Sequence, residues 1–591
     1  MPYDGLVLAA VTKELRDGFT GGRIERIYQP GKEEISMAVH RQGVRGKLLL
    51  SANPVQPRVH LTTAEFSNPI TPPQFCMLLR KYLEGGRFSG FRQPELERVL
   101  VIEIDSRDEL GHPAPKELIV EIMGKHSNII LVDPVSGLIL DGIKRYSHAV
   151  SRHREVLPGR PYVAPPAQEK ANPLGIGEEE FRNICLRSPL DTTLPQLLQN
   201  SFAGLSMTSS RELVYRAGLA FDTILDHCGE YELRALWQAC HSFFDQAAAG
   251  CFHSCLLFDL RGTPVDFAAL ELSHTGLKQE KDSMNALLDK FYRHLANNNR
   301  IRQERNSILK IVNKELKKQQ KKLAIFAGTL NDDASLAQYK LFGELLTANI
   351  YRLGRGMTQV ALEDYQQDDE MITVPLDPRK SPVENAQWYF KQYNKGKNAR
   401  VALGVQRQNT EEIVDYLESV KTNLEQCDDL PSLGEIKQEL TEQGFLKPPP
   451  TGKAGKKKAK EKAKPNLIRV LSSDGLEILV GKNNRQNDYL TLKLAKDHDM
   501  WLHTKSIHGA HVIIRTEGGE IPPATLQEGA LLAAYFSKGR ASSNVPVDYT
   551  KRKHVNKPNA ARPGMVIYTH QKTITCTPEE ELVERILRSD M

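Results

Sequence analysis

The chain has 591 residues, of which 40% are hydrophobic and 26% charged, and its formal net charge is +6. Single hydrophobic cores rarely grow past about 250–300 residues, so several domains are expected. No apolar run approaches the roughly 18 residues of a membrane span, and the N-terminus lacks the basic start of a signal peptide. Eight scattered cysteines form no CxxC pair, which argues against a disulfide framework and favours a reducing cytoplasm.

Residues 1–172 alternate helical and strand-like segments, which predicts an α+β domain. Helices are expected near Val7–Phe19 and over FCMLLRKYLEG, which begins at Phe75. The expected strands are Arg23–Tyr28, Glu34–His40, Gly46–Ser51, Arg98–Ile104, Glu117–Ile122 and Asn128–Val132.

Two places in this domain carry polar residues that a plain strand does not need. Glu97-Arg98 opens an apolar strand, and EIMGKHSN (Glu121–Asn128) separates two apolar runs. Gly124 lets a ligand approach the backbone, Lys125 and His126 can meet phosphate, and the Ser-Asn pair that follows can bond a base edge or a sugar. On spacing alone, an ordinary hairpin turn built from Gly, Ser and Asn is the stronger interpretation.

Residues 173–275 are predicted to be mainly helical. A helix over Leu194–Phe202, a turn at Ala203–Ser206 and a second helix capped near Ser206 resemble a helix-hairpin-helix, whose glycine turn offers backbone N–H groups to phosphate. A plain αα-hairpin is an equal alternative. The pattern Cys251-Phe-His253-Ser-Cys255 lacks an evident fourth ligand, so no metal site is expected.

Residues 276–443 predict an antiparallel coiled coil of two helical runs, 278–328 and 405–443. Ile413, Leu417, Val420 and Leu424 follow heptad spacing in the second run. Segment 290–322 holds eleven Lys or Arg and two Glu, whereas 410–443 holds ten acids and two Lys. Opposite charge predicts that the two runs pair and neutralise each other, forming a spacer on the order of 60–75 Å long between two heads.

A small tip domain is expected at about 330–400, inside the coiled coil. Its segment Asn385–Lys395 interleaves aromatic and basic residues, which either stack on RNA or pack a globular tip. We expect Trp388 and Phe390 to pack. The expected RNA contacts are Lys391, Lys395 and Lys397.

The C-terminal part begins with a Lys/Pro-rich linker, 444–465, whose composition predicts disorder. Residues 466–591 predict a second α+β domain that contains DMWLHTKSIHGAHV. His503 and Lys505 are two residues apart and should face the same side of a strand. These two residues and the basic run Lys551, Arg552 and Lys553 are candidate RNA contacts.

Three basic clusters therefore lie on a chain that is otherwise acidic: the first helical run, the linker and segment 536–562. Together they favour a large polyanion touched at several places, hence nucleic acid, although each cluster alone suits a solvated surface. No Walker A, GxGxxG, GxSxG or HExxH motif occurs, and no nucleophile–base–orienter set is evident. No catalytic residue, cofactor or metal is expected.

The order of these segments, with EIMGKHSN and DMWLHTKSIHGAHV, resembles the NFACT family, whose bacterial branch is also called the fibronectin-binding protein A family. The resemblance covers essentially the whole chain and includes the specific segments GLVLAAVTKELRDGFTGGRIERIYQP and SPVENAQWYFKQYNKGK. It implies a glycosylase-like N-terminal domain that holds tRNA, a coiled-coil arm and a C-terminal RNA-binding domain.

The function that the resemblance implies is ribosome-associated quality control. Such a factor binds a large ribosomal subunit that still carries peptidyl-tRNA and recruits tRNA-Ala for template-free C-terminal alanine tailing, which marks the stalled chain for degradation. Large-subunit rRNA and a small RNA-binding elongation partner such as RqcP are the implied further partners, and the ribosome supplies the chemistry. The implied tRNA-binding residues are Glu97, Arg98, Glu121, Ile122, Met123, Gly124, Lys125, His126, Ser127 and Asn128.

Two positions depart from the family's pattern, since Glu97 stands for an Asp and Lys125 for an Arg; lysine keeps the charge but loses the bidentate fork. A fibronectin-binding surface adhesin is the alternative function, and the N-terminus, cysteines and basic clusters argue against it. A DNA glycosylase would use Pro2 as its nucleophile, but no zinc-finger cysteines follow the hairpin.

Overall fold

The computed structural model describes residues 3–149, 153–166, 168–259, 262–329, 333–364, 370–448 and 465–588. Most of the predicted disordered linker, 449–464, lies outside these residues. The chain divides into two compact units, Met1–Ala296 and Asn297–Met591. All eight cysteines are free. Within the described residues, no helix is long and apolar enough to cross a membrane and no group of three or more His, Cys, Asp or Glu could hold a metal ion.

The N-terminal unit is built on a nine-stranded antiparallel sheet with the order β4-β3-β2-β1-β5-β6-β7-β8-β9. Helices α1 (Gly5–Phe19) and α2 (Gln74–Leu83) accompany it, as predicted. The strands are β1 (Arg23–Gly31), β2 (Glu34–Arg41), β3 (Val44–Ser51), β4 (Arg58–Leu61), β5 (Arg87–Arg92), β6 (Val99–Asp105), β7 (Lys116–Glu121), β8 (Asn128–Asp133) and β9 (Leu138–Gly142).

The β6–β9 end of this sheet is buried on both faces. Leu100 and Ile102 join the main core, whereas their neighbours Val99 and Val101 join a second cluster with Val156. Alternate residues of a strand point to opposite faces, so both faces of β6 need apolar cover. The polar residues at the ends of these strands therefore stand on a rigid support.

The predicted helical region contains α3 (Glu178–Arg187), α4 (Leu194–Ser201), α5 (Met207–Arg216) and α6 (Glu230–Ala248). The helix–turn–helix prediction is confirmed, with Ser206 as the N-cap of α5. The region is mainly helical up to Ala248, after which a three-stranded sheet follows α6. Its strands are β10 (Cys255–Phe258), β11 (Pro264–Ala268) and β12 (Lys278–Lys281).

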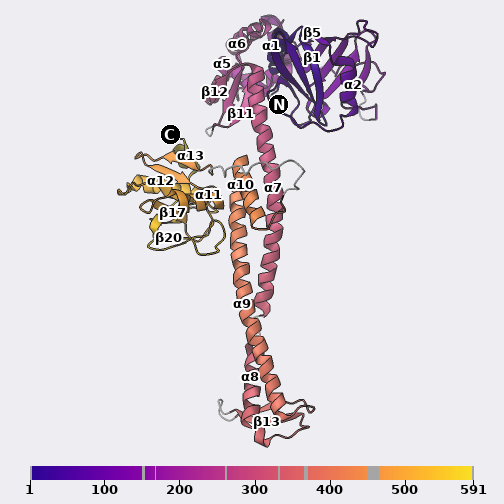
Figure 1. The fold of residues 1–591 in the computed structure, drawn as a ribbon. Helices are drawn as coiled ribbons and strands as arrows, with labels where there is room; N and C mark the ends of the chain where they lie inside the picture. Colours follow the sequence, from indigo (N-terminus) through magenta and orange to yellow (C-terminus); the bar gives the residue numbers. More distant parts are fainter. Residues whose placement is uncertain are drawn as a thin grey trace. The chain divides into compact units, whose positions relative to one another are not determined.

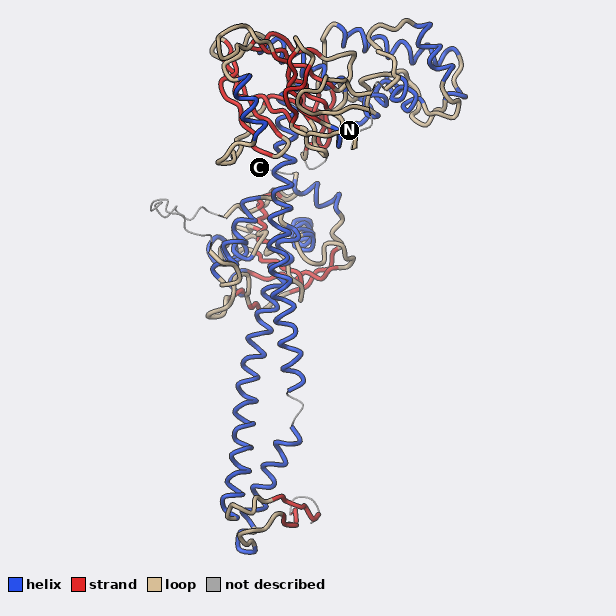
Figure 2. Tube along the Cα trace, turned by 90° about the vertical axis from the view of Figure 1, so that its right-hand side faces the viewer, coloured by secondary structure: helices blue, strands red, loops and turns tan. Residues whose placement is uncertain are grey.

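Two long helices form most of the arm, α7 (Met284–Thr329) and α9 (Pro382–Gln426). The sequence colouring of Figure 1 shows them running in opposite directions, and Figure 2 shows them side by side. Their shared core contains the predicted seam residues Leu417, Val420 and Leu424 of α9 with Ile301 and Ile308 of α7. Burying one apolar stripe of each helix against the other stabilises such a pair, because neither stripe is covered alone.

The second predicted run is not one continuous helix. It ends at Gln426, and a separate helix α10 (Leu430–Glu442) begins after Asp429, whose carboxylate caps it by accepting from Ser432 N at 2.7 Å. Leu433, Ile436 and Leu440 of α10 enter the same core as the α7–α9 seam. Beside α10, the arm therefore consists of three packed helices.

The predicted tip contains α8 (Asp333–Ala348) and the hairpin β13 (Gln359–Asp364) and β14 (Glu370–Pro375). The aromatic segment Asn385–Lys395 forms the first turns of α9 and packs into the tip, because Ala386 and Tyr389 share an apolar core with Phe342 of α8 and Val374 of β14. Tyr389 is buried with Phe342, whereas Trp388 remains 38% exposed beside Tyr339.

The C-terminal domain has a six-stranded sheet with the order β15-β16-β18-β17-β19-β22. Its apolar core packs helix α12 against this sheet, joining Ala530 and Leu532 to Leu502 and Ile514. The elements are β15 (Ile468–Leu471), β16 (Glu477–Val480), α11 (Asn484–Tyr489), a π-helical turn (Leu490–Leu494), β17 (Met500–Thr504), β18 (Val512–Ile514), α12 (Pro523–Tyr535), β19 (Val545–Lys551), β20 (Val555–Asn556), β21 (Ile567–Tyr568), β22 (Lys572–Cys576) and α13 (Glu580–Leu587).

The prediction that the acids of 410–443 pair with the cations of α7 is wrong. Within α7, Arg300 pairs with Glu304 and Lys318 with Glu315, each at 3.1 Å. Several carboxylates of 410–443 contact the C-terminal domain instead. Their contacts there are Glu418 with His508 and Lys538, Asp429 with Lys482, Glu435 with Asn483 and Gln486, Glu439 with Asn484, and Glu442 with Arg485.

Candidate nucleic-acid interface

The two polar motifs of the N-terminal unit lie side by side. Glu97-Arg98 precedes β6, and β7 ends at Glu121, which pairs with Val99 in the antiparallel ladder. Beyond that pair, Ile122 N donates to the carbonyl of Arg98 at 2.8 Å. The structure therefore brings both predicted motifs to one end of neighbouring strands, an arrangement that spacing along the chain did not reveal.

The approach to Glu97-Arg98 is a constrained loop. Glu95 and Leu96 both have left-handed backbone angles, with φ of 41° and 57°. Such angles are uncommon for residues other than glycine and require support from the surroundings. Gln93 gives that support, since its Nε2 donates to the carbonyls of Gly5 and Glu97 at 2.8 and 2.9 Å. The two motif side chains are each half-exposed.

The loop after β7 presents few side chains to solvent. Gly124 adopts φ 58° at the start of a short 3-10 turn, and Lys125 and His126 are exposed on it. Ser127 Oγ accepts from Met123 N at 2.8 Å, and the Asn128 side-chain amide bonds the backbone N–H and C=O of Lys144. The motif residues that are buried are Glu121, Ile122, Gly124, Ser127 and Asn128, while Met123 is half-buried.

Glu121 cannot meet a ligand, because its side chain is 0% exposed. Its two carboxylate oxygens accept from Arg154 Nη1 and Nη2 at 2.6 and 2.5 Å, and Tyr162 OH donates to Oε1 at 3.0 Å. Arg154 is itself only 6% exposed. Burial and the Glu121 carboxylate together raise the pKa of Tyr162, which keeps its hydroxyl proton in place as a donor. The Glu121–Arg154 ion pair therefore holds the loop in place and does not contact a ligand.

A polar pocket of about 120 Å³ opens beside Glu97-Arg98, and the sequence analysis missed it. Its walls come from the start of α1, the loop before β6, the segment near Lys170, the end of α4 and the α4–α5 turn. Residues this far apart share no local pattern, so only the fold could reveal the pocket. Its lining residues are Asp4, Gly5, Leu96, Glu97, Arg98, Gln168, Lys170, Gln199, Ala203, Gly204, Leu205 and Ser206.

The pocket is closed by contact between three backbone segments. A Cβ on Gly5 would stand 2.0 Å from the carbonyl oxygen of Leu96 and 2.6 Å from the Cα of Gly204, so only glycine fits there. Gly204 has φ 83°, and Leu6 N donates to its carbonyl at 3.3 Å. The α4–α5 turn is thereby held against the Glu97-Arg98 loop.

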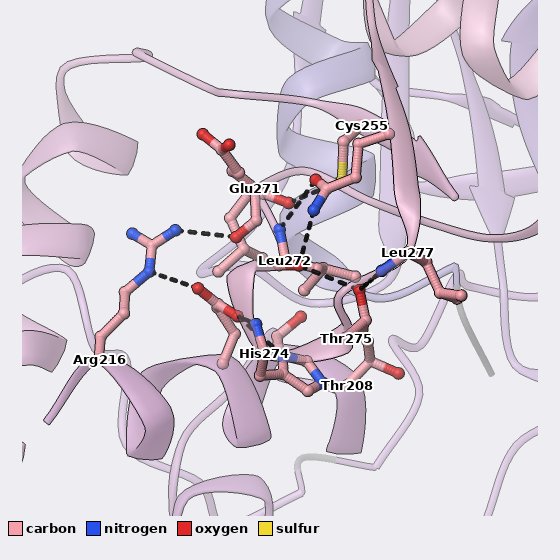
Figure 3. A network of polar contacts seen from close by, with 12 residues as sticks. Thr208, Arg216, Cys255, Glu271, Leu272, His274, Thr275 and Leu277 are labelled. Atoms are coloured by element: carbon pink, nitrogen blue, oxygen red, sulfur yellow. Dashed lines mark hydrogen bonds and ion pairs between the residues drawn. The ribbon is translucent and has the colours of Figure 1, made fainter. Parts of the chain in front are cut away.

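A buried network anchors α5 behind this turn (Figure 3). Glu212 accepts from Arg216 Nε at 2.8 Å and lies 2.7 Å from His274 Nδ1, while Arg216 Nη2 donates to the carbonyl of Glu271 at 2.8 Å. Burial opposes ionisation of Glu212, but the hydrogen bonds from Arg216 and His274 outweigh it and hold the pKa of this carboxyl below its usual range.

The candidate contacts of the C-terminal domain do not share one environment. His503 stacks on Trp501 at 5.7 Å and lies 5.4 Å from the His511 ring. Burial, and then His508, lower the pKa of His503 to about 4, so it is neutral at pH 7 and offers no charge to phosphate. Lys505 is exposed in the turn after β17, so the expectation that both residues share one strand face does not apply.

The remaining candidates are surface cations. Lys551 and Lys553 are exposed, whereas Arg552 is engaged, donating to Thr491 O and Asp497 at 2.9 Å each. The α9 candidates Lys391, Lys395 and Lys397 are all exposed.

The family model for NFACT N-terminal and middle domains matches residues 4–462, and that for the NFACT protein RNA binding domain matches residues 467–569. The protein named Rqc2 homolog RqcH from Bacillus subtilis is 39% identical over 100% of both chains. Its namesake from Streptococcus suis is 37% identical over 99% of both. The solved N-terminal part of a fibronectin/fibrinogen-binding protein from Streptococcus suis is 35% identical, covers 49% of this chain and 99% of its own, and has a TM-score of 0.42. The chain belongs to the NFACT family.

Proposed function

We propose that this protein is a ribosome quality control factor that binds tRNA through its N-terminal unit and ribosomal RNA through its C-terminal domain. Full-length relatives that carry the RqcH name support the first part, and the matched RNA binding domain supports the second. The observation that carries the tRNA site is the placement of Arg98 next to the exposed Lys125–His126 turn, through the 2.8 Å bond between Ile122 N and Arg98 O.

The finer activity follows from the family resemblance. The protein recognises a large ribosomal subunit that holds peptidyl-tRNA and recruits tRNA-Ala for alanine tailing of the stalled chain, in the cytoplasm and together with an RqcP-like partner. Bond formation is left to the ribosome, so the protein needs no catalytic side chain of its own.

Within the tRNA site the ten motif residues divide into two roles. Arg98, Lys125 and His126 are the exposed or half-exposed donors that meet phosphate or sugar, and Glu97 accepts from a ribose hydroxyl or an exocyclic amine. The others hold the loop in shape. They are Glu121, Ile122, Met123, Gly124, Ser127 and Asn128.

Ribosomal RNA is contacted by exposed cations that need not form one patch, since phosphate contacts supply affinity without reading sequence. Six of the predicted residues suit this role, because their side chains are exposed: Lys391, Lys395, Lys397, Lys505, Lys551 and Lys553. Neutral His503 and engaged Arg552 support the fold around them.

A fibronectin-binding adhesin is the alternative function, suggested by the older name of the family. The RqcH relatives, which do not carry that name, match nearly all of this chain. An adhesin would not require a tRNA-binding site.

Replacing Arg98 with alanine tests the site. A charge-assisted hydrogen bond contributes about 1.5–3 kcal/mol, so we expect tRNA that co-purifies with the protein to fall at least roughly tenfold. Co-sedimentation with large ribosomal subunits should stay near the wild-type level, because the cations of the second unit are intact. Normal tRNA recovery with the variant would remove Arg98 from the site.

A further inference from the structure

The pocket beside Glu97-Arg98 holds a second cation that no motif predicted. Lys170 is half-buried in its wall, and its Nζ donates to the carbonyl of Gln199 at 2.7 Å. Throughout the part of the chain that the structure describes, no carboxylate lies within ion-pair distance of this ammonium. Among the described residues, the Lys170 ammonium therefore has a backbone carbonyl as its partner and no carboxylate at ion-pair distance.

Arg98 and Lys170 both line this small space. Burial lowers the pKa of Lys170, the nearby guanidinium of Arg98 lowers it further, and Glu97 offsets only part of the effect. Two cations that share a half-buried pocket repel one another, and their repulsion is relieved when an anion enters between them. A pocket that places two cations beside one carboxylate, Glu97, has a net positive charge and favours an anion.

The acids of the lining do not fill that role. Both oxygens of Asp4 are already bonded, Oδ1 by Val7 N at 2.9 Å and Oδ2 by the Ser209 hydroxyl at 2.8 Å. Burial raises the pKa of Asp4, against the opposing effect of these hydrogen bonds. Glu97 is half-exposed and remains available to accept from a neighbouring donor. Backbone at the start of α1 and at the N-cap of α5 adds the positive ends of two helices to the wall.

We infer that this pocket is a phosphate subsite of the tRNA-binding site, in which Arg98 and Lys170 hold one backbone phosphate against the α4–α5 turn. The inference rests on the proposed function, because the phosphate is taken to belong to tRNA. Arg98 offers a planar fork and Lys170 a point charge, so the two together grip two oxygens of one phosphate from different sides. Glu97 then lies where a ribose hydroxyl next to that phosphate can donate to it.

A purely structural role for Lys170 is the competing explanation. Gln199 lies in the last turn of α4, and a lysine bonded to such a carbonyl is a common helix C-terminal cap. A cap affects stability, but it does not change how binding of a polyanion depends on salt. The salt dependence therefore separates the two roles.

The test uses the full-length protein and fluorescently labelled, deacylated tRNA, titrated over a series of KCl concentrations. Lys170→Met is expected to weaken binding about tenfold and to reduce the slope of log K against log salt by about 0.7–0.9, the value for one phosphate contact. Lys170→Arg should stay within about threefold of the wild type. Lys32→Met is the matched control: it removes an exposed lysine between β1 and β2 and should change neither quantity.

The outcomes separate this inference from the proposed function. If the wild type does not bind tRNA, both fail. If the wild type binds and Arg98→Ala weakens it, but Lys170→Met leaves the affinity and the salt slope unchanged, only the phosphate subsite is overturned. A loss of affinity with an unchanged slope would likewise assign Lys170 to capping α4 and overturn the subsite.

Discussion

Replacing Arg154 with methionine is expected to destabilise the N-terminal unit by about 3–5 kcal/mol. The substitution keeps an apolar stem but leaves the carboxylate of Glu121 buried, with Tyr162 OH as its remaining side-chain donor. Removing one partner of a buried ion pair lowers the free energy of unfolding strongly, because the remaining charge has neither water nor a counter-charge around it. The same change should loosen the Ile122–Asn128 loop and weaken tRNA binding.

Tryptophan fluorescence can follow this unfolding, because the chain's three tryptophans lie in different parts of the molecule. Trp237 sits in the core of the N-terminal unit, so urea unfolding in a variant with Trp388→Phe and Trp501→Phe reports on that unit. Arg160→Met is the matched control. Its ion pair with Glu155 is solvent-exposed on the arginine side, and the expected change is about 1 kcal/mol or less.

A double variant gives the sharper check. Glu121→Leu combined with Arg154→Met removes both charges, so it should recover most of the stability that Arg154→Met loses. An Arg154→Met protein within about 1 kcal/mol of the wild type would contradict the view that this pair anchors the loop.

Stability of the C-terminal unit should fall by about 3 kcal/mol between pH 5 and pH 8, through one carboxyl, Glu439. Burial raises the pKa of Glu439 to about 7, although hydrogen bonds from Asn484 and Tyr416 act in the other direction. The native state therefore holds a proton that the unfolded chain releases near its ordinary pKa of 4.5. Stability is then greatest below pH 4.5, falls as pH rises to about 7 and stays low above it.

Glu439→Gln should remove this pH dependence and stabilise the unit at pH 8. Glutamine keeps an oxygen that can accept from Asn484 Nδ2 and Tyr416 OH, now 3.1 and 2.8 Å from Oε1. The readout is Trp501 fluorescence during urea unfolding, with Trp237 and Trp388 replaced by Phe. Glu435→Gln, which also changes an acid facing the C-terminal domain, should leave the pH dependence in place. A flat wild-type profile between pH 5 and 8 would contradict the assignment.

The contacts between the C-terminal domain and the arm are largely polar. Asp429 meets Lys482, Glu418 meets Lys538 and Asn423 bonds Asn484. Interfaces of this polar kind between domains of one chain resemble transient protein–protein interfaces. The acidic surface of α9–α10 covers cations that would otherwise face solvent, which explains why segment 410–443 is so acidic.

Local signals in the sequence predicted much of the fold. Period-2 and heptad patterns gave the N-terminal strands and the α7–α9 seam, because they report which faces are buried. Two boundaries were missed although their signals were present. Ser381 and Glu384 form a capping box at the start of α9, with Pro382 as its first residue, and Asp429 caps α10, which has a proline in its first turn. The short strand Cys255–Phe258 carried no periodicity that distinguishes a strand from a buried helix.

The site was predictable by residue type but not by geometry. The motif segments were correctly singled out as unusual, yet nothing local could show that Glu121 is buried against Arg154 or that Lys170 shares a pocket with Arg98. The partner of the acidic segment 410–443 was mispredicted for a related reason. A sum of charges over a segment does not say which face carries them, and the acids of 410–443 face the C-terminal domain instead of α7.

Sequencing of RNA crosslinked to the protein in cells tests the central proposal most directly. Ultraviolet crosslinking of the wild type and of Arg98→Ala, followed by purification and sequencing, reports every RNA within contact distance. The proposal predicts enrichment of tRNA-Ala and large-subunit rRNA with the wild type, and selective loss of the tRNA with Arg98→Ala. Recovery of neither RNA above background with the wild type would contradict the account.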